Sequence, residues 1–334
     1  MIISRTPFRI SLFGGGTDYP KWYLKHGGAV LGTAINKYCY ISIRNLPPFF
    51  EHRYRIVYSR IELVNDVRDI EHPAVRAALR EFPRQAGLEL HHDGDLPARS
   101  GLGSSSSFTA GLVTALQARN GKMINPKELA EQVIRIEQDV IGENVGSQDQ
   151  IWAAYGGTNL ITFNIDGSFD VRQIPLSAEY KSELQSHLML MFTGMTRIAS
   201  EIAADVISSI DDRETELKEM REMVDEGVKL MSNEQHSIAD LGRLLHQSWL
   251  RKRSLTAGIT NTIIDEIYET ALSAGAYGGK LLGAGGGGFM LFLAPPEAQQ
   301  KIREQLKSII QVDIEIGAGG SRVVVYEPDG LEWR

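Results

Sequence analysis

The chain has 334 residues, a length that predicts about two domains, each with enough apolar residues for a packed core. It carries 35 Lys and Arg against 42 Asp and Glu, for a formal net charge of −7, and this balance disfavours a nucleic-acid partner. One cysteine, no apolar run near the roughly 18 residues of a membrane span and no recognisable signal peptide together predict a cytoplasmic protein without disulfides or a membrane partner.

Strands and helices alternate in the first half of the chain. Strands are predicted over residues 8–13, 38–44 and 54–59, and a helix is predicted over 108–119.

Two further helices of this half each begin with a polar cap. The segment Asn125-Pro126-Lys127-Glu128 is typical of a helix N-terminus, and Gly142 should end this helix. Ser147 and Gln150 form a capping-box pattern, which places Asp149 in the first turn of the next helix, where the helix dipole favours a carboxylate. The apolar stripe of the first of these helices is predicted to be Leu129, Val133, Ile136 and Val140.

The second half begins with a predicted strand over residues 187–192 and continues as a strongly helical region over 195–275, whose first helix opens at Arg197. A charged stretch over 211–229 is typical of a solvated helix face. The tail contains predicted strands at 280–282, 289–293 and 323–326, with a helix at 296–309 between the last two. We place the division between two domains near residue 180.

A glycine-rich turn, Gly14-Gly15-Gly16-Thr17-Asp18, follows the first predicted strand. Glycines let the backbone approach a ligand closely, and the Asp18 carboxylate can accept hydrogen bonds from substrate hydroxyls. The alternative is a tight turn in which Asp18 caps the short segment after it, since turn chemistry accounts for every residue.

A second small-residue cluster, residues 96–107, leads directly into the helix predicted over 108–119. Backbone N–H groups at a helix N-terminus form an anion site that suits phosphate, and the serine hydroxyls add donors and a possible Mg²⁺ ligand. The alternative is a flexible Gly/Ser linker, which an ordered Leu-Pro before the cluster and a helix after it disfavour.

A third cluster, residues 280–288, contains a G-x-G-x-x-G pattern. A strand follows it instead of the helix that a dinucleotide-binding fold requires, so an NAD-dependent oxidoreductase is disfavoured. A simple hairpin turn between two strands is the alternative interpretation of this cluster.

Two carboxylates complete the set of candidate residues. Glu137 borders the buried stripe of its helix, where an unpaired carboxylate is costly, so we expect a partner such as a cation or a metal ion. The alternatives are a structural salt bridge for Glu137 and ordinary decoration of a helix start for Asp149.

Together these segments resemble the motifs of the GHMP kinase superfamily, which is named for galactokinase, homoserine kinase, mevalonate kinase and phosphomevalonate kinase. Residues 97–105 match its nucleotide-phosphate motif, residues 280–288 resemble its third motif, and residues 7–19 are similar to the galactokinase sugar signature. Glu137 and Asp149 keep the spacing that separates the metal-binding Glu from the catalytic Asp in galactokinases.

The resemblance implies an α+β fold of two domains. Residues 1–180 would form an N-terminal domain similar to ribosomal protein S5 domain 2, and residues 181–334 a ferredoxin-like C-terminal domain, with ATP and substrate in the cleft between them. It also implies an ATP-dependent kinase that uses Mg²⁺ and acts on a small-molecule sugar or sugar phosphate, as a monomer or a homodimer.

The resemblance further implies roles for single residues. Asp149 would orient or deprotonate the sugar hydroxyl, and Arg9 would hold Asp149 ionised. Ser105 and Glu137 would bind Mg²⁺. The residues expected at the sugar are Gly15, Gly16, Thr17 and Asp18. The residues expected at the nucleotide are Pro97, Ser100, Gly101, Leu102, Gly103, Ser104, Ser105, Ser106, Gly285 and Gly286.

The substrate is expected to differ from galactose, because galactokinases carry Glu-His where this chain has Gly15-Gly16. The glycine version, together with residues 192–197 and 252–255, is more similar to bacterial D-glycero-D-manno-heptose 7-phosphate kinases, which phosphorylate the anomeric hydroxyl. A 7-phosphate needs a cation at the far end of the pocket from Asp149, and Arg197 is our candidate. An exposed arginine at a helix start is the alternative interpretation of Arg197.

Three other functions stay open on the same fold. They are a free-sugar 1-kinase of the galactokinase or fucokinase type, a catalytically silent sugar sensor, and a kinase for a non-sugar such as homoserine or mevalonate. Members of the last class lack the Gly-Thr-Asp sugar signature after the first strand, and intact Glu137 and Asp149 disfavour the sensor.

Overall fold

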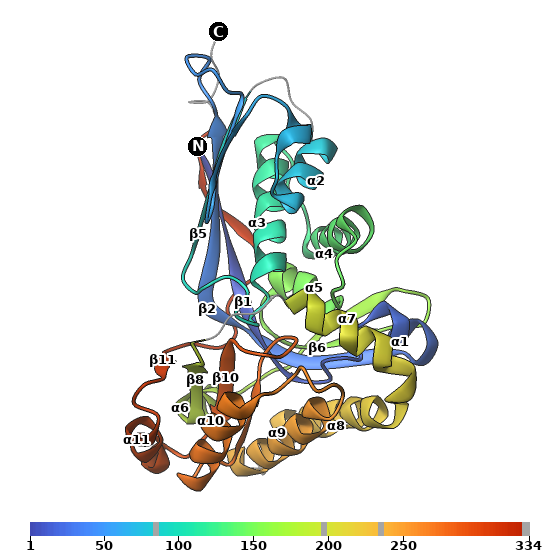
Figure 1. Cartoon of the computed structure of the whole chain (residues 1–334), viewed down its shortest axis with the longest axis vertical. Coiled ribbons are helices and arrows are strands. Elements are labelled where there is room, and N and C mark those ends of the chain that lie inside the picture. Colours follow the sequence, from blue (N-terminus) through green and yellow to red (C-terminus); the bar gives the residue numbers. More distant parts are fainter. Residues whose placement is uncertain (83–86, 195–198, 233–236, 329–334) are drawn as a thin grey trace.

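The computed structural model describes residues 1–82, 87–194, 199–232 and 237–328 (Figure 1). Its larger sheet has eight strands and runs β12-β1-β2-β5-β3-β4, with β6 paired to β2 and β7 to β6. All pairs are antiparallel except β3 with β5. The strands are β1 (Ile2–Phe13), β2 (Gly28–Asn45), β3 (Tyr54–Val57), β4 (Ile61–Val64), β5 (Leu88–Gly94), β6 (Thr158–Phe163), β7 (Phe169–Gln173) and β12 (Arg322–Tyr326).

Most helices of the first half, among them α2 to α5 (within residues 73–155), lie along one face of this sheet, whereas α6 (Ala178–His187) lies beside the second sheet (Figure 1). The central helix, α3 (Ser104–Arg119), is buried along most of its length. Gly111 lets it approach β1, where the Ser4 hydroxyl donates to the Gly111 carbonyl at 2.7 Å. This packing fixes the N-terminus of α3 beside the end of β1. The helices are α1 (Pro20–His26), α2 (Pro73–Glu81), α3 (Ser104–Arg119), α4 (Pro126–Ile134), α5 (Gln148–Tyr155) and α6 (Ala178–His187), with a 3₁₀ turn at Val67–Asp69 and a π-helical segment at Arg135–Ile141.

The second sheet is ferredoxin-like, as the resemblance predicts. Its strand order is β11-β8-β10-β9, all antiparallel, and helices separate its first strand from its second and its third from its fourth. The strands are β8 (Leu188–Phe192), β9 (Gly278–Leu281), β10 (Phe289–Leu293) and β11 (Ile310–Val312). The helices are α7 (Ala199–Ser209), α8 (Glu214–Ser232), α9 (Ile238–Arg253), α10 (Thr262–Ser273) and α11 (Pro296–Gln305), with a 3₁₀ turn at Ile210–Asp212.

The two halves share their core. Phe13 and Leu31 of the large sheet belong to the same buried cluster as Val224 of α8 and Leu291 of β10. The last strand, β12, returns to the large sheet and pairs with β1, so the tail of the chain joins the N-terminal half. The predicted division near residue 180 stays a prediction. Within the described ranges, no helix is long and apolar enough to cross a bilayer.

Several predicted elements are confirmed, among them β3, β8, β10, β12 and the cap of α4, where the Asn125 side chain accepts from the Glu128 amide at 2.9 Å. The prediction that Val140 lies on the buried stripe is wrong, because it is 46% exposed. The π-helical segment inserts one residue per turn relative to an α-helix and so rotates the positions after Ile134. Gly142 ends this segment, as predicted, with φ +77°.

The predicted capping box at Ser147 and Gln150 is also wrong. The Ser147 side chain makes no cap hydrogen bond and instead lies 3.2 Å from the Tyr23 hydroxyl, while the Gln150 amide donates to Glu137 at 2.6 Å. A buried carboxylate needs donors, and this requirement outweighs the local capping pattern. Asp149 still lies in the first turn of α5, as predicted.

Candidate active site

A cleft between the two halves collects most of the candidate residues. Its volume of about 190 Å³ would hold roughly a dozen water molecules, enough for a small-molecule substrate. It is bordered by the end of β1 and the turn after it, the start of α3, the segment before α5, and parts of α7, α9 and β9. The charged groups in its lining are Arg9, Asp18, Arg99, Asp149, Lys252 and Lys280.

Two glycine loops from opposite halves of the chain pack backbone against backbone at one wall of the cleft. Gly101 has φ +83°, and a Cβ there would lie 2.5 Å from the Leu282 carbonyl oxygen. A Cβ on Gly283 would lie 2.4 Å from the Gly101 Cα, and one on Gly288 would lie 2.3 Å from the Ser100 carbonyl oxygen. The third glycine cluster therefore holds the loop that leads into α3 and is more than a hairpin turn.

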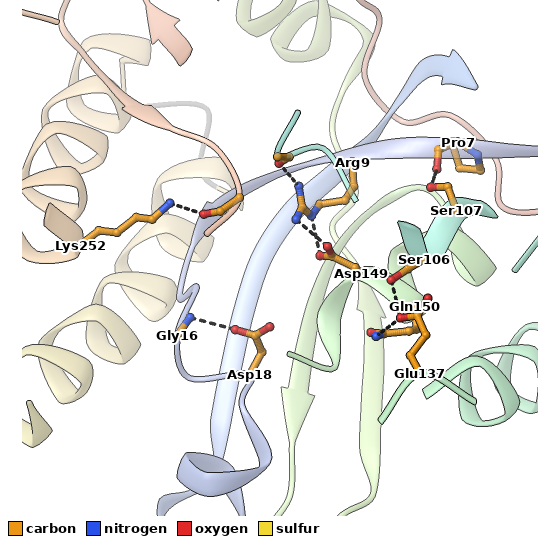
Figure 2. Close-up of polar contacts among 12 residues, drawn as sticks. Pro7, Arg9, Gly16, Asp18, Ser106, Ser107, Glu137, Asp149, Gln150 and Lys252 are labelled. Atoms are coloured by element: carbon orange, nitrogen blue, oxygen red, sulfur yellow. Dashed lines mark hydrogen bonds and ion pairs between the residues drawn. The ribbon is translucent and has the colours of Figure 1, made fainter. Parts of the chain in front are cut away.

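Arg9 and Asp149 form a bidentate ion pair at the start of this loop (Figure 2). Arg9 donates from Nε to Asp149 Oδ1 and from Nη2 to Asp149 Oδ2, both at 2.8 Å, and from Nη1 to the Gly101 carbonyl at 2.6 Å. Arg9 is nearly buried, whereas 27% of the Asp149 side chain is exposed. The pair fixes the carboxylate while leaving it accessible, and each of its oxygens keeps a lone pair for another donor.

Asp18 lies close to Asp149 on the floor of the cleft. Its Oδ1 accepts from the Gly16 amide at 2.9 Å. Burial raises the pKa of Asp18, the Gly16 amide lowers it, and the nearby Asp149 charge raises it. A Cβ on Gly146 would lie 1.9 Å from Asp18 Oδ2, so only glycine lets the segment before α5 cross here. Asp18 therefore faces the ligand space with its position tightly determined.

Glu137 is buried behind the serines that open α3 (Figure 2). The Ser106 hydroxyl and the Gln150 amide both donate to its Oε2, at 2.8 and 2.6 Å, whereas Oε1 has no hydrogen-bond partner. Burial raises the pKa of Glu137 to about 7, against the lowering effect of hydrogen bonds from Thr109 and Ser106. The expected partner was a cation or a metal ion; the groups that the chain itself supplies to Glu137 are neutral donors.

Two lysines lie in the wall that the C-terminal half contributes. Lys252, near the end of α9, donates to the carbonyls of Leu281 and Gly283 at 2.8 and 2.5 Å, and Lys280 of β9 donates to the Leu12 carbonyl at 2.8 Å. Burial lowers the pKa of both ammonium groups, that of Lys280 to about 7, and their mutual repulsion lowers the pKa of Lys252 further.

We expect the free energy of unfolding to depend on pH through Lys280. Its pKa is about 7 in the folded chain and near 10.5 when unfolded, so the unfolded state binds more protons between these values. Stability should then rise with pH across this window. From pH 7 to pH 9, we expect the wild type to gain at least about 1 kcal/mol relative to Lys280→Met. Denaturant titrations of both proteins at the two pH values measure this difference. An equal change in the free energy of unfolding of the two proteins between pH 7 and pH 9 would contradict it.

The structure brings ten predicted site residues to the lining of the cleft: Arg9, Gly15, Gly16, Asp18, Gly101, Gly103, Ser104, Ser105, Ser106 and Asp149. Thr17 lies behind the turn, where its hydroxyl donates to the carbonyls of Gly14 and Ala29. Gly286 is outside the lining, and its amide donates to the carbonyl of Ile259, which borders the cleft. Other predicted residues outside the lining are Pro97, Ser100, Leu102, Glu137 and Gly285. Arg197 lies outside the described residues.

Lys252 and Lys280 were missed as site residues, although the sequence carries a signal for each. Lys252 continues the apolar stripe of Leu241, Leu245 and Trp249 at helical spacing, so it had to be buried. Lys280 stands in a strand that is otherwise glycine and leucine. Lysine is almost never fully buried unless it is paired, so a lysine at a buried position indicates a functional or structural role.

A helix N-terminus that faces a cleft, beside a carboxylate held by a guanidinium, is typical of a phosphotransferase for small molecules. Phosphoryl transfer requires positioning and charge neutralisation more than covalent chemistry. Family models agree with this class. The GHMP kinases N terminal domain matches residues 68–157, and the GHMP kinases C terminal model matches residues 228–310.

Individual relatives cover nearly the whole chain. A D-glycero-alpha-D-manno-heptose 7-phosphate kinase of Campylobacter jejuni is 30% identical over 92% of this chain and 93% of its own length. A bifunctional fucokinase/GDP-fucose pyrophosphorylase of Arabidopsis thaliana is 27% identical over 93% of this chain and 31% of its own length. The crystal structure of a D-glycero-D-manno-heptose 1-phosphate kinase from Bacteroides thetaiotaomicron has the same fold, with a TM-score of 0.73 and 22% identity. The match covers 98% of this chain and 100% of that one.

The chain belongs to the GHMP kinase family, and it is a sugar kinase. The resemblance stated from the sequence motifs and the α+β fold that it implied are thereby confirmed.

Proposed function

We propose that this sugar kinase transfers the terminal phosphoryl group of ATP to the anomeric hydroxyl of D-glycero-D-manno-heptose 7-phosphate. The Arg9–Asp149 pair carries the chemical part of this proposal, because it places an accessible, oriented carboxylate next to the loop that opens α3. The relative from Campylobacter jejuni, whose name gives a heptose 7-phosphate as its substrate, supports the acceptor.

The loop and the first turn of α3 are the proposed site for the nucleotide phosphates. Gly101 and Gly103 have positive φ angles and line the cleft together with Ser104–Ser106. The α3 N-terminus provides amides without helical partners and the positive end of a 16-residue helix dipole, which together stabilise an anion.

Asp149 and Asp18 are the proposed contacts of the sugar. Asp149 accepts the proton of the anomeric hydroxyl as the oxygen attacks the terminal phosphorus, a new P–O bond forms, and the bond from that phosphorus to ADP breaks. Arg9 keeps the Asp149 carboxylate in place and lies beside the negative charge of the transferring group. Asp18 holds the sugar through its other hydroxyls.

Glu137 fits a role as a Mg²⁺ ligand. Its Oε1 is buried without a hydrogen-bond partner, and the Ser106 hydroxyl stands between it and the cleft. No group of three or more His, Cys, Asp or Glu side chains able to hold a metal ion occurs in the described part of the chain, which fits an ion held by one carboxylate and by substrate phosphates. Serine hydroxyls at Ser105 or Ser106 would complete the protein ligands, and Mg²⁺ would neutralise charge on the nucleotide phosphates.

We expect Glu137→Gln to raise the Mg²⁺ concentration that gives half-maximal activity by about 10-fold or more, because a neutral amide is a poor ligand for a hard cation. A titration of activity with Mg²⁺ measures this concentration. Asp139→Asn is the control, since Asp139 lies in the same π-helical segment but is exposed and outside the lining of the cleft. An unchanged titration in Glu137→Gln would make Glu137 a structural carboxylate.

A screen for ADP release tests the proposed function. The purified chain is incubated with ATP, Mg²⁺ and a panel of free sugars and sugar phosphates that includes heptose 7-phosphate, and ³¹P NMR of the product shows which hydroxyl carries the new phosphate. The highest kcat/KM is expected with heptose 7-phosphate. Preference for an unphosphorylated sugar would instead make the chain a free-sugar 1-kinase of the galactokinase or fucokinase type.

A further inference from the structure

The two cleft lysines are almost inaccessible to water, with Lys252 8% and Lys280 2% exposed. In the described part of the chain neither ammonium forms an ion pair, and both donate to backbone carbonyls alone. Burying a charge without an opposite charge is strongly unfavourable. An apolar residue of similar size at such a position would give a more stable fold than lysine does. Two of them at one wall of a cleft therefore indicate a ligand of negative charge.

The charged groups around the two lysines do not neutralise their ammonium groups. Arg9 repels both of them, Lys252 and Lys280 repel one another, and Asp18 attracts both. The lining of the cleft as a whole holds four cationic side chains and two carboxylates, of which Asp149 is already paired with Arg9. An anionic ligand is needed to balance the rest.

Donors remain available on both ammonium groups. A protonated lysine has three N–H donors; Lys252 uses two on carbonyls and Lys280 uses one. Three donors are thus left at a wall where both side chains border the cleft. A phosphate monoester has three terminal oxygens and a charge near −2, and lysine is a common partner for it.

The contacts of the pair place it on the side of the cleft where Asp18 lies. In Figure 2, Lys252 and Glu137 lie on opposite sides of the Arg9–Asp149 pair. Asp18, the proposed sugar contact, is the carboxylate whose charge acts on both lysines. Lys280 donates to the carbonyl of Leu12, shortly before the turn that ends at Asp18, so it borders the proposed sugar site. Lys252 holds the carbonyl of Gly283, whose loop packs against Gly101, and so lies between that loop and Asp18.

We propose that Lys252 and Lys280 together bind a phosphate group carried by the sugar acceptor, at the end of the acceptor remote from the hydroxyl that Asp149 faces. This inference rests on the proposed function, because it needs an acceptor that enters with one phosphate already attached. It assigns selectivity for a phosphorylated sugar to two side chains of the C-terminal half.

The experiment compares steady-state kinetics of the wild type, Lys252→Met and Lys280→Met with heptose 7-phosphate and with the unphosphorylated heptose. We expect KM for the phosphorylated sugar to rise at least about 10-fold in each variant, with little change for the free sugar or for ATP. Lys21→Met is the matched control: Lys21 also donates to a backbone carbonyl, that of Ile207 at 2.9 Å, but it lies outside the cleft.

The outcomes separate this inference from the function beneath it. Equal rises in KM for both sugars, or none, in an enzyme that uses heptose 7-phosphate would overturn the lysine site alone. A rise in KM for ATP with no change for the sugar phosphate would assign the lysines to the nucleotide. A wild type that releases ADP only with unphosphorylated sugars would overturn the proposed acceptor.

A binding measurement on the wild type keeps the test decisive if a variant does not fold. A phosphate dianion placed beside Lys280, which faces Arg9, Asp18 and Lys252, raises the affinity of its ammonium for the proton. Titration calorimetry at pH 8, in buffers of different ionisation enthalpy, should therefore show net proton uptake with heptose 7-phosphate and none with the free heptose. No difference between the two sugars would overturn the lysine site.

Discussion

Replacing Asp149 by asparagine is expected to lower kcat by about 100-fold or more while nucleotide binding is retained. The amide keeps the shape of the side chain but cannot accept the proton of the sugar hydroxyl, and it offers Arg9 one acceptor oxygen where the carboxylate offers two. Single-turnover measurements of phosphoryl transfer, together with a nucleotide binding titration, separate the chemical step from binding.

Asp66 offers a matched control for this experiment. It too forms a bidentate pair with an arginine, since Arg68 donates to both of its oxygens at 3.0 and 2.7 Å, but it is remote from the cleft. Asp66→Asn should leave kcat within about twofold of the wild type. A kcat for Asp149→Asn close to that of Asp66→Asn would remove Asp149 from the mechanism.

Gly101→Ala is expected to have the second large effect, a loss of nucleotide binding with a loss of about 2–4 kcal/mol in the free energy of unfolding. The position combines φ +83° with a Cβ that would lie 2.5 Å from the Leu282 carbonyl oxygen and 2.9 Å from its carbon. Because both contacts are backbone atoms, relief requires the two glycine loops to separate. Nucleotide titrations and denaturant unfolding measure the two losses.

Gly121 isolates the effect of the dihedral angle alone. It has φ +68°, and no atom lies within 4 Å of a Cβ added there. Gly121→Ala should therefore lose only about 1 kcal/mol of stability and keep normal nucleotide affinity. If Gly101→Ala behaved in the same way, the contact between the two loops would not matter for the nucleotide.

Local sequence chemistry predicted much of the fold. The cap at Asn125, the stop at Gly142 and the apolar strand over 289–293 depend on neighbours within a few residues, and all three are present in the structure. The π-helical segment depends on tertiary packing that buries Glu137 against Ser106, so spacing alone misplaced Val140. Likewise, β12 was expected as a strand, but its pairing with β1 joins opposite ends of the chain.

Site residues that lie within a recognisable motif were predictable from the sequence, and those outside such motifs were less predictable. Asp18, Asp149 and the loop around Gly101 come together as expected from their motifs. The local sequence does not identify Lys280 as a site residue, because its neighbours are glycine and leucine. The indication of a function is its burial, which depends on the fold. For Gly146, the need for glycine arises from Asp18, 128 positions earlier in the chain, which no local pattern reveals.

The pairing of β12 with β1 also bears on how the protein is synthesised. The hydroxyls of Thr6 and Ser321, 2.8 Å apart beside this pairing, are separated by 315 positions in the chain. At about 5–20 residues per second, a ribosome needs roughly 15–60 s to reach the second after making the first. During that time β1 has an open edge, which can pair with a strand of a neighbouring nascent chain. The edge closes once β12 has left the ribosome and paired with β1, so we expect aggregation during translation to begin at this edge.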